Sequence, residues 1–483
     1  MSLKRAKALL RLGTLALLVA GIAAPVGTAN PYKVKDLQPI SGPSPFAAGC
    51  GGARDETRIT GYEFEPTLAV NPADPRNIIA AWQQDRSLVA AARTHLVAAS
   101  TDRGRTWTRV QVPGISKCTG GQQDAVADAW LTIGPDGAAY LASLPGIASQ
   151  AGFAVEFLAN RSIDGGLSWS APVRVAAADP RTDKEAIAAD PGAPGTVYAT
   201  WGSRDPDRLP FSVNALLFAR TRDGGVTWSP PQTIDVPPPG EVDQSSVPLV
   251  LPGGDVLVVF SRVSFAGEEP TATVLATRSG DGGASWSAPA LVAGPITIHL
   301  IPDPETGFPL PAQGAGIPTQ AVAPDGTVYV AWEEDDSASS GRIVFSRSRD
   351  GGLSWSAPRP LAEVGAFAFM ATLAVTSRGT VGATWYDLRN DRPGDGELTT
   401  DVWFAHSHDR GQAWERSHLA GPFDLRTAPE FNLGEYQALA PLPGGAFAAV
   451  FAQAGPQAQD GPTDIFFARL GPGRGPNATR GGS

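Results

Sequence analysis

Carboxylates, arginines and tyrosines recur in the sequence where apolar runs begin or end, and these side chains could do chemistry. They are Gln84 to Arg86, Asp183 to Glu185, Arg204, Asp205, Asp243, Gln244, Arg262, Glu333 to Asp336, Tyr386, Asp387, Arg389, Glu435 and Tyr436. Carboxylates can transfer protons, arginines can bind an anionic group, and a tyrosine can act as a nucleophile once it is activated. The alternative is a solvated polar rim. Either way, a scaffold must bring these residues to one place.

A repeated motif indicates what that scaffold is. The form Ser/Thr-x-Asp-x-Gly-x-x-Trp occurs around Asp102, Asp164, Asp223, Asp281, Asp350 and Asp409. Glycine supplies a positive φ in a tight turn, the aspartate accepts hydrogen bonds from turn N–H groups, and the tryptophan packs beneath the turn. We therefore assign these aspartates a structural role and exclude them from the active site. Calcium or sugar binding at each of them is the less favoured interpretation.

The motif recurs about every 60 residues, a period that suits a four-stranded propeller blade better than a helical repeat. Between copies, stretches such as "TVYVAW" and "RIVFSRS" follow "PDG"-type turns. Their β-branched and aromatic residues are typical of antiparallel strands. First strands can be placed in seven units. We predict an all-β fold, a single β-propeller of four-stranded blades, with seven blades favoured and six as the alternative.

The seventh unit lacks both the Asp motif and a fourth strand. Because a ring of blades must close, we expect the N-terminal segment, residues 30–64, to supply the missing strand. The propeller would then span residues 65–470. The tail, residues 471–483, has the sequence "GPGRGPNATRGGS" and is predicted to be disordered.

The first residues indicate export. Lysines and arginines precede an apolar run from about Leu12 to Ala24, and small residues follow as far as Ala29. This pattern predicts a signal peptide over residues 1–29 and a secreted protein. A membrane anchor is the less favoured alternative, because the run is shorter than the roughly 20 residues that span a bilayer.

Cysteine content and charge narrow the partners. Cys50 and Cys118 are the two cysteines of the chain, and in an oxidising compartment they are expected to form one disulfide. The formal net charge is −10, and lysines and arginines are scattered rather than clustered. This distribution argues against nucleic acid as a partner.

The repeated motif resembles the Asp-box, or bacterial neuraminidase repeat, of the sialidase superfamily, and its copies run from Ser100 to Trp414. Sialidases use a tyrosine nucleophile activated by a glutamate, an aspartate acid/base, and three arginines that bind the sialate carboxylate. By this resemblance, "EYQALAPLPGGAFAAVFA" places Tyr436 at the nucleophile. The segment "DQSSVPLVLPGGDVLVVFSR" places Arg262 at one arginine and Gln244 where the activating glutamate should be.

The remaining site candidates complete the same scheme. Asp85, at the end of the first unit's second strand, is the expected acid, and Arg342 is the expected third arginine. Further substrate-binding candidates on the rim are Arg86, Arg204, Asp387, Arg389 and Glu333. The acidic run Glu333 to Asp336 lacks the ligand spacing of a calcium loop. No cofactor or metal is therefore expected, with Ca²⁺ left open without a motif.

Two positions depart from the pattern of the family. The Arg-Ile-Pro signature of the first unit is replaced by Phe64, Glu65 and a proline, and Arg58 lies outside it. The glutamate that supports the missing arginine is Ala452 here.

Two functions of different class follow. The first is an exported, sialidase-like, exo-acting glycoside hydrolase, with exo-α-sialidase activity as its narrowest form. The second is a non-catalytic extracellular propeller that binds glycan or protein. A carbohydrate or glycoconjugate is the expected partner, with no stable membrane span after processing. Convergence of Tyr436, Arg262 and a carboxylate in the central funnel would favour the enzyme.

Overall fold

The computed structural model describes residues 32–473 apart from short gaps. The gaps are 53–56, 89–90, 150–151, 180–181, 205–212, 268, 299–302, 304, 306–315, 336–340, 362–366, 456–457 and 459. The predicted signal peptide lies outside the described residues, and so do residues 474–483 of the predicted tail. In the part of the chain that is described, no helix has the length and apolar character to cross a membrane.

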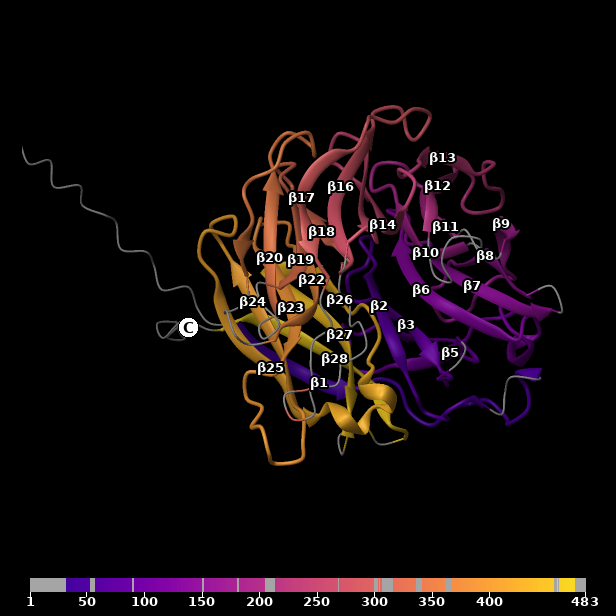
Figure 1. Ribbon diagram of the computed structural model, residues 1–483. Helices are drawn as coiled ribbons and strands as arrows, with labels where there is room; N and C mark the ends of the chain where they lie inside the picture. Colours follow the sequence, from indigo (N-terminus) through magenta and orange to yellow (C-terminus); the bar gives the residue numbers. More distant parts are fainter. Residues whose placement is uncertain are drawn as a thin grey trace, which may run out of the picture. The chain divides into compact units, whose positions relative to one another are not determined.

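Seven antiparallel sheets of four strands form the fold, which confirms the predicted seven-bladed, all-β propeller (Figure 1). Blade 1 consists of β2 (Phe64–Val70), β3 (Ile78–Gln84), β4 (Thr94–Ser100) and β5 (Thr108–Gln111). Blade 2 consists of β6 (Ala125–Ile133), β7 (Ala139–Ser149), β8 (Gly152–Ser162) and β9 (Val173–Asp179). Blade 3 consists of β10 (Thr182–Ala189), β11 (Val197–Arg204), β12 (Val213–Thr221) and β13 (Gln232–Asp235). Blade 4 consists of β14 (Glu241–Val250), β15 (Val256–Ser264), β16 (Thr271–Ser279) and β17 (Ala290–Thr297). Blade 5 consists of β18 (Thr319–Val322), β19 (Val328–Asp335), β20 (Gly341–Ser348) and β21 (Arg359–Pro360). Blade 6 consists of β22 (Phe369–Val375), β23 (Val381–Asp387), β24 (Thr399–Ser407) and β25 (Glu415–Asp424). Short 3-10 turns occur at η2 (Lys117–Thr119), η3 (Leu425–Thr427), η4 (Pro429–Phe431) and η5 (Pro443–Gly445).

Blade 7 is built from both ends of the described chain. Its strand order is β26 (Ala438–Leu442), β27 (Ala446–Ala454), β28 (Thr463–Pro472) and then β1 (Tyr32–Pro39). Strand β1 pairs antiparallel with β28, with Tyr32 opposite Pro472 and Val34 opposite Leu470. In Figure 1 the indigo β1 lies beside the yellow β28. The N-terminal strand therefore supplies the fourth strand of the last blade.

Large aromatic residues on the second strands fill the space between blades. Trp82, Trp201, Trp332 and Trp385 occupy equivalent positions near the ends of β3, β11, β19 and β23, and each is at most 1% exposed. Each such side chain removes roughly 150–250 Å² from water. Packing between faces of neighbouring blades is therefore the main source of stability, and it leaves the ends of the strands free to carry polar residues.

The Asp motifs lie in the turns between third and fourth strands, where they hold the backbone. The Oδ1 atom of Asp350 accepts hydrogen bonds from the main-chain N–H groups of Leu353 (3.2 Å) and Ser354 (2.9 Å), and from the hydroxyl of Ser348 (2.7 Å). The indole of Trp355 donates to a turn carbonyl at 3.1 Å. Hydrogen bonds from Ser354 lower the pKa of Asp350 to about 2. This carboxylate is fully used by its own turn.

Arginines just before three of the motifs tie each blade to the next. Arg278, on β16 of blade 4, donates to the carbonyl oxygens of Asp350 (3.3 Å) and Gly351 (3.5 Å) in the blade 5 turn. Arg220 of blade 3 donates in the same way to the turn of blade 4, and Arg347 of blade 5 donates to that of blade 6 at 2.6 Å. We call these three residues the inter-blade arginines. Through these arginines, the turn that each motif forms is also hydrogen-bonded to the preceding blade.

The predicted disulfide is confirmed. Cys50 and Cys118 are bonded, which joins the segment after β1 to turn η2.

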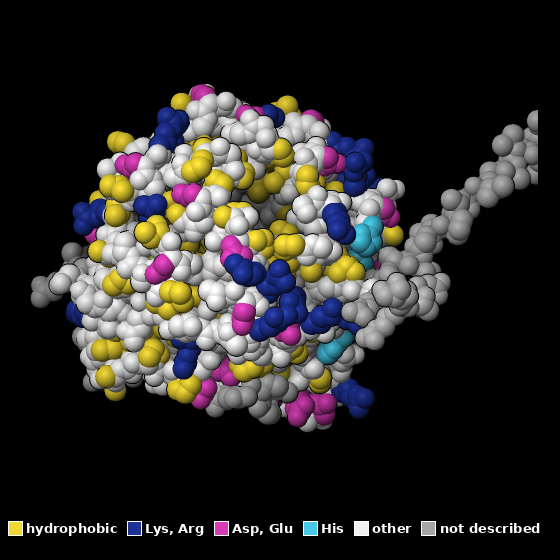
Figure 2. All heavy atoms as spheres, turned by 180° about the vertical axis from the view of Figure 1, so that it is seen from behind, with side chains coloured by type: hydrophobic (Ala, Val, Ile, Leu, Met, Phe, Trp, Pro, Cys, Tyr) yellow, Lys and Arg dark blue, Asp and Glu magenta, His cyan; other side chains and the backbone are white. Residues whose placement is uncertain are grey.

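Seen from behind, the surface is hollowed near the middle of the visible face, and lysine and arginine side chains gather beside the hollow (Figure 2).

Candidate active site

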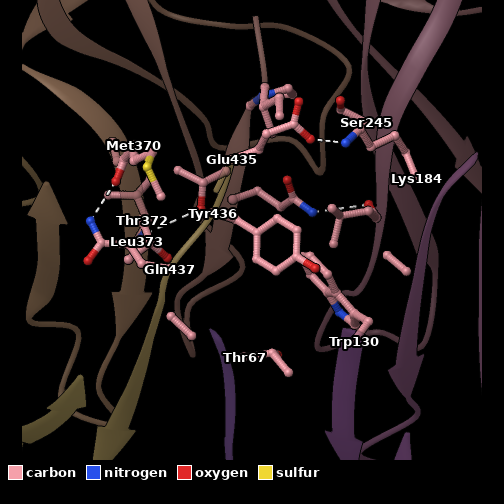
Figure 3. Close-up of a pocket in the computed structure, with 18 of the residues that line it drawn as sticks. Thr67, Trp130, Lys184, Ser245, Met370, Thr372, Leu373, Glu435, Tyr436 and Gln437 are labelled. Atoms are coloured by element: carbon pink, nitrogen blue, oxygen red, sulfur yellow. Dashed lines mark hydrogen bonds and ion pairs between the residues drawn. The ribbon is translucent and has the colours of Figure 1, made fainter. Parts of the chain in front are cut away.

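A cavity of about 210 Å³ opens where the inner strands begin, and all seven blades contribute to it. We call this cavity the funnel. It is lined by Pro66 to Leu68, Asp128, Trp130, Leu131, Lys184 to Ala186, Ser245 to Val247, Ile317 to Gln320, Glu333, Met370 to Leu373 and Glu435 to Leu439. Figure 3 shows labelled members of this set. Among the predicted site residues, Tyr436 and Glu333 therefore lie in one cavity.

A bulge at the same point of five inner strands aims side chains at the funnel. Glu65, Asp128, Lys184, Ser245 and Met370 all have φ values between 44° and 55°. The pairing of each inner strand with its second strand shifts register there. A left-handed backbone is unfavourable for residues other than glycine, and such bulges are frequent beside active sites. Four of the five bulge residues line the funnel, Glu65 being the exception.

Tyr436 lies against blade 2. Its hydroxyl accepts a hydrogen bond from the N–H of Ala129 (3.0 Å) and lies 3.3 Å from the carbonyl oxygen of Ala129, to which it donates. Its ring packs at 5.7 Å from the ring of Trp130, as Figure 3 shows. Burial, followed by the carboxylates of Glu65 and Asp128, raises the pKa of the Tyr436 phenol well above its ordinary value. The tyrosine is therefore protonated unless a base takes its proton.

Glu65 is the carboxylate best placed to be that base. It is buried behind Tyr436 and accepts hydrogen bonds from Gln83 and from the main-chain N–H of Glu435 (3.1 Å). Burial and then Asp128 raise its pKa, while Lys184, Arg86 and a hydrogen bond with Tyr436 act in the opposite direction, and the result is about 7. Burial thus keeps the pKa of this carboxyl above that of an ordinary glutamate.

Lys184 and Glu435 form an ion pair across the mouth of the funnel (Figure 3). Glu435 is thus held away from the hydroxyl of its neighbour Tyr436.

Two further carboxyls face the funnel from other blades. Glu185 is 3% exposed, and burial, then Asp128, raises its pKa well above the ordinary value. Glu333, on the opposite side, accepts a hydrogen bond from the N–H of Met370, and burial raises its pKa to about 8. Burial therefore favours the protonated form of both groups when no cation lies beside them, and in that form they can donate a proton.

The arginines expected to bind substrate lie outside the funnel and bind local carboxylates. Arg262 pairs with Asp243 (2.8 Å) and with Asp235. Arg342 pairs with Glu334 (2.8 Å), which follows Glu333 on β19 and points to the other side of the strand. Tyr436 and Arg262 are therefore not brought together.

The other rim candidates behave in a similar way. Arg389 binds Asp387, with Nε 2.8 Å from Oδ2, and stacks 4.0 Å from the ring of Trp403. Arg86 lies 4.2 Å above the ring of Phe64. The side chain of Arg204 lies outside the described residues. Within the described lining of the funnel there is no arginine.

Asp85, expected as the acid, is buried in blade 1 rather than exposed in the funnel. Its carboxylate binds Arg93 (3.0 Å), the hydroxyl of Ser44 (2.6 Å) and the N–H of Gly61 (2.9 Å). Gln244, on β14, lies opposite Ser261 of β15 and does not line the funnel. The structure thus gives Asp85 a clear role in holding the N-terminal segment against blade 1.

Sequence reasoning gave no role to Asp128 or Trp130, and it treated Glu65 only as a missing arginine. Each of these residues lies at, or close to, the point where a charged residue breaks the apolar pattern of an inner strand. That point is the same in each of their blades. Superposing "FEPTLAV", "ADAWLTI" and "TDKEAIAA" on each other would have revealed a charged residue at the equivalent point of three blades. This recurrence was the available signal.

Comparison with known proteins decides the family of the repeat. Residues 215–428 match the model described as "BNR repeat-like domain". This part of the propeller therefore resembles a BNR repeat-like domain. The resemblance drawn from the six Asp motifs is thereby confirmed. The sequence matches no curated protein at a significant level.

Solved structures with similar folds come from several sources. A protein of unknown function from Dyadobacter fermentans is 12% identical, with 86% of this chain and 95% of that chain covered and a TM-score of 0.47. A Penicillium chrysogenum α-L-arabinanase complexed with arabinobiose is 13% identical, with 90% and 98% covered and a TM-score of 0.46. A Hadza microbial sialidase is 14% identical, with 80% and 75% covered and a TM-score of 0.46. At these identities and scores the substrates of those proteins do not transfer to this propeller.

Proposed function

We propose that the propeller is an exo-acting glycoside hydrolase whose funnel is the active site. The observation that carries this proposal is the position of Tyr436, which lines the funnel and interacts electrostatically with the carboxyls of Glu65, Asp128 and Glu185. In the proposed mechanism Tyr436 is the nucleophile, Glu65 is its base, and Asp128 is the acid/base. Tyrosine nucleophiles of this kind are an accepted variant of glycosidase chemistry.

The reaction would run in two balanced steps. First, the oxygen of Tyr436 bonds to the anomeric carbon while the glycosidic C–O bond breaks. Glu65 takes the phenol proton, and Asp128 gives a proton to the leaving oxygen. Second, water attacks the anomeric carbon, its proton passes to Asp128, and the bond to Tyr436 breaks as Glu65 returns the proton.

The size of the funnel supports removal of one terminal unit. Its volume of about 210 Å³ is below the roughly 300–1,000 Å³ of sites for drug-sized ligands. A single sugar ring, rather than a chain of several, matches such a cavity. Sialosides are the least favoured substrates, because an anionic sugar would find no arginine among the described lining residues.

A second candidate function is a non-catalytic propeller that binds a glycan. The specific observation in its favour is that both hydrogen-bonding directions of the Tyr436 hydroxyl are already used by Ala129. In that case the polar lining recognises a sugar, and no bond is broken.

A panel of fluorogenic glycosides tests the proposal. The purified protein should hydrolyse at least one neutral or amino glycoside, and Tyr436→Phe and Asp128→Asn should each reduce turnover by at least about 1,000-fold. Glu334→Gln is the matched control, because this carboxylate lies on the rim outside the funnel. If the panel shows binding without turnover, the second candidate replaces the first.

We also propose that the protein acts outside the cytoplasm. The predicted signal peptide over residues 1–29 and the bond between Cys50 and Cys118 both support export. N-terminal sequencing of protein recovered from the medium or periplasm should show a new terminus near Asn30. An uncleaved protein confined to the cytoplasm would exclude export.

A further inference from the structure

Several carboxyl groups line the funnel. Its described lining contains the carboxyl groups of Asp128, Glu185, Glu333 and Glu435. The one cation among these lining residues is Lys184, which is already paired with Glu435. A cationic ligand would therefore stabilise the ionised form of these carboxyls by pairing with them, and an anionic ligand would not.

Glu185 is the group in this lining that most needs a ligand. It is 3% exposed, and neither carboxyl oxygen has a hydrogen-bond partner beyond its own main-chain N–H. Buried polar atoms in native proteins are almost always hydrogen-bonded, so each exception requires an explanation. The proposed mechanism does not use Glu185, which leaves it available for recognition.

Nearby groups add acceptors rather than donors. The amide nitrogen of Gln320 donates to the carbonyl oxygen of Val247 (3.1 Å), and its Oε1 atom is buried without a partner. The amide cannot be reversed, because reversal would place two oxygens against each other. The ring faces of Trp130 and Tyr436 also attract cations. A ligand that satisfies this wall must bring hydrogen-bond donors.

Resting on the proposed function, we propose that the substrate is an amino sugar whose protonated amine binds the carboxylate of Glu185. An ammonium group brings three donors and no acceptor. It would also add positive charge beside Tyr436, Glu65 and Asp128. The substrate would then supply, within the funnel, the cation that arginines supply in a site for anionic sugars.

Calorimetry on the full, processed protein at pH 7 tests this inference. The probes are methyl glycosides of glucosamine, galactosamine and mannosamine, their N-acetyl forms, and N-acetylneuraminic acid. At least one free amine should bind about 10- to 100-fold more tightly than its N-acetyl form, the range expected for a charge-assisted hydrogen bond. Glu185→Gln should abolish this preference, and the rim control Glu334→Gln should keep it.

Several outcomes would overturn the inference. These are equal binding of free and acetylated amines, tightest binding of N-acetylneuraminic acid, and a preference that survives Glu185→Gln. If Glu185→Gln does not fold, wild-type protein is treated with a carbodiimide and glycinamide and mapped by mass spectrometry. The preferred amino sugar should then protect Glu185 from modification, and unchanged labelling would contradict the proposal.

A butylammonium probe separates this inference from the proposed function. Binding of butylammonium that depends on Glu185, with no sugar bound, would support the cation site and reject the glycoside hydrolase. Turnover of neutral glycosides without any preference for amines would do the reverse.

Discussion

Replacing Tyr436 by phenylalanine separates the structural role of its hydroxyl from its proposed chemical role. The change deletes one oxygen atom, which leaves the buried N–H of Ala129 without its 3.0 Å acceptor. An unsatisfied buried donor costs about 1–3 kcal/mol. Unfolding entropy of roughly 2.1 cal/mol/K per residue, over about 440 residues, is about 0.9 kcal/mol/K. The melting temperature should therefore fall by roughly 1–3 °C.

A second tyrosine provides the matched control for this experiment. Tyr386 is fully buried, and its hydroxyl donates to the carbonyl of Ala452 at 2.8 Å, outside the funnel. Tyr386→Phe should lower the melting temperature by a similar amount and leave turnover within a factor of about three. Differential scanning calorimetry and initial rates on the best substrate of the panel measure both effects. Comparable rates for the two variants would refute Tyr436 as nucleophile.

Further predictions concern the scaffold and the pH dependence of stability. For Asp350→Asn, the stability lost relative to wild type should be complete above pH 4 and shrink toward pH 2, because the lowered pKa of Asp350 makes its contribution disappear as pH falls through about 2. Melting curves at pH 6, 3 and 2 check this, and a constant difference would contradict it. Glu333→Gln should melt at a higher temperature than wild type by an amount that grows between about pH 4.5 and 8, because the raised pKa of Glu333 means that its ionisation destabilises the fold as pH rises. Equal melting temperatures at pH 9 would count against it. Arg278→Met should lower the melting temperature without altering ligand binding in the funnel, since its hydrogen bonds join two blades far from that site. Reduction of the bond between Cys50 and Cys118, which lie 68 residues apart, should cost about 4 kcal/mol, measured by chemical denaturation with and without reductant.

Six of the seven blades were predictable because each Asp motif specifies a turn by local chemistry alone, and the seventh followed from its first strand. Asp350 and its neighbours hold the same hydrogen bonds whatever surrounds the blade. The position of Tyr436 in the central cavity followed from its place before the last inner strand. Local signals of this kind survive folding unchanged.

The surroundings of the site could not be predicted in the same way. Arg262 lies opposite Asp243 on the neighbouring strand, and its guanidinium forms an ion pair with that carboxylate instead of facing the funnel. The bulges at Asp128 and Lys184 need left-handed backbone at residues that are not glycine, so no glycine marks them, and the charged residue that recurs at this point does not by itself specify a bulge. Which side chains face the funnel therefore depended on backbone detail that composition does not encode.

The pairing of β1 with β28 sets an order of events during synthesis. Strand β1 leaves the ribosome first, and its partner follows roughly 400 residues later, so an edge strand remains unpaired until almost the whole chain is made. Closing so long a loop adds little entropy cost per extra residue, but such non-local pairing is slow. A nascent chain interrupted between β25 and β28 would therefore contain the strands of six complete blades and an open ring. Completion of the last hydrogen-bonded ladder thus reports that synthesis has passed β28.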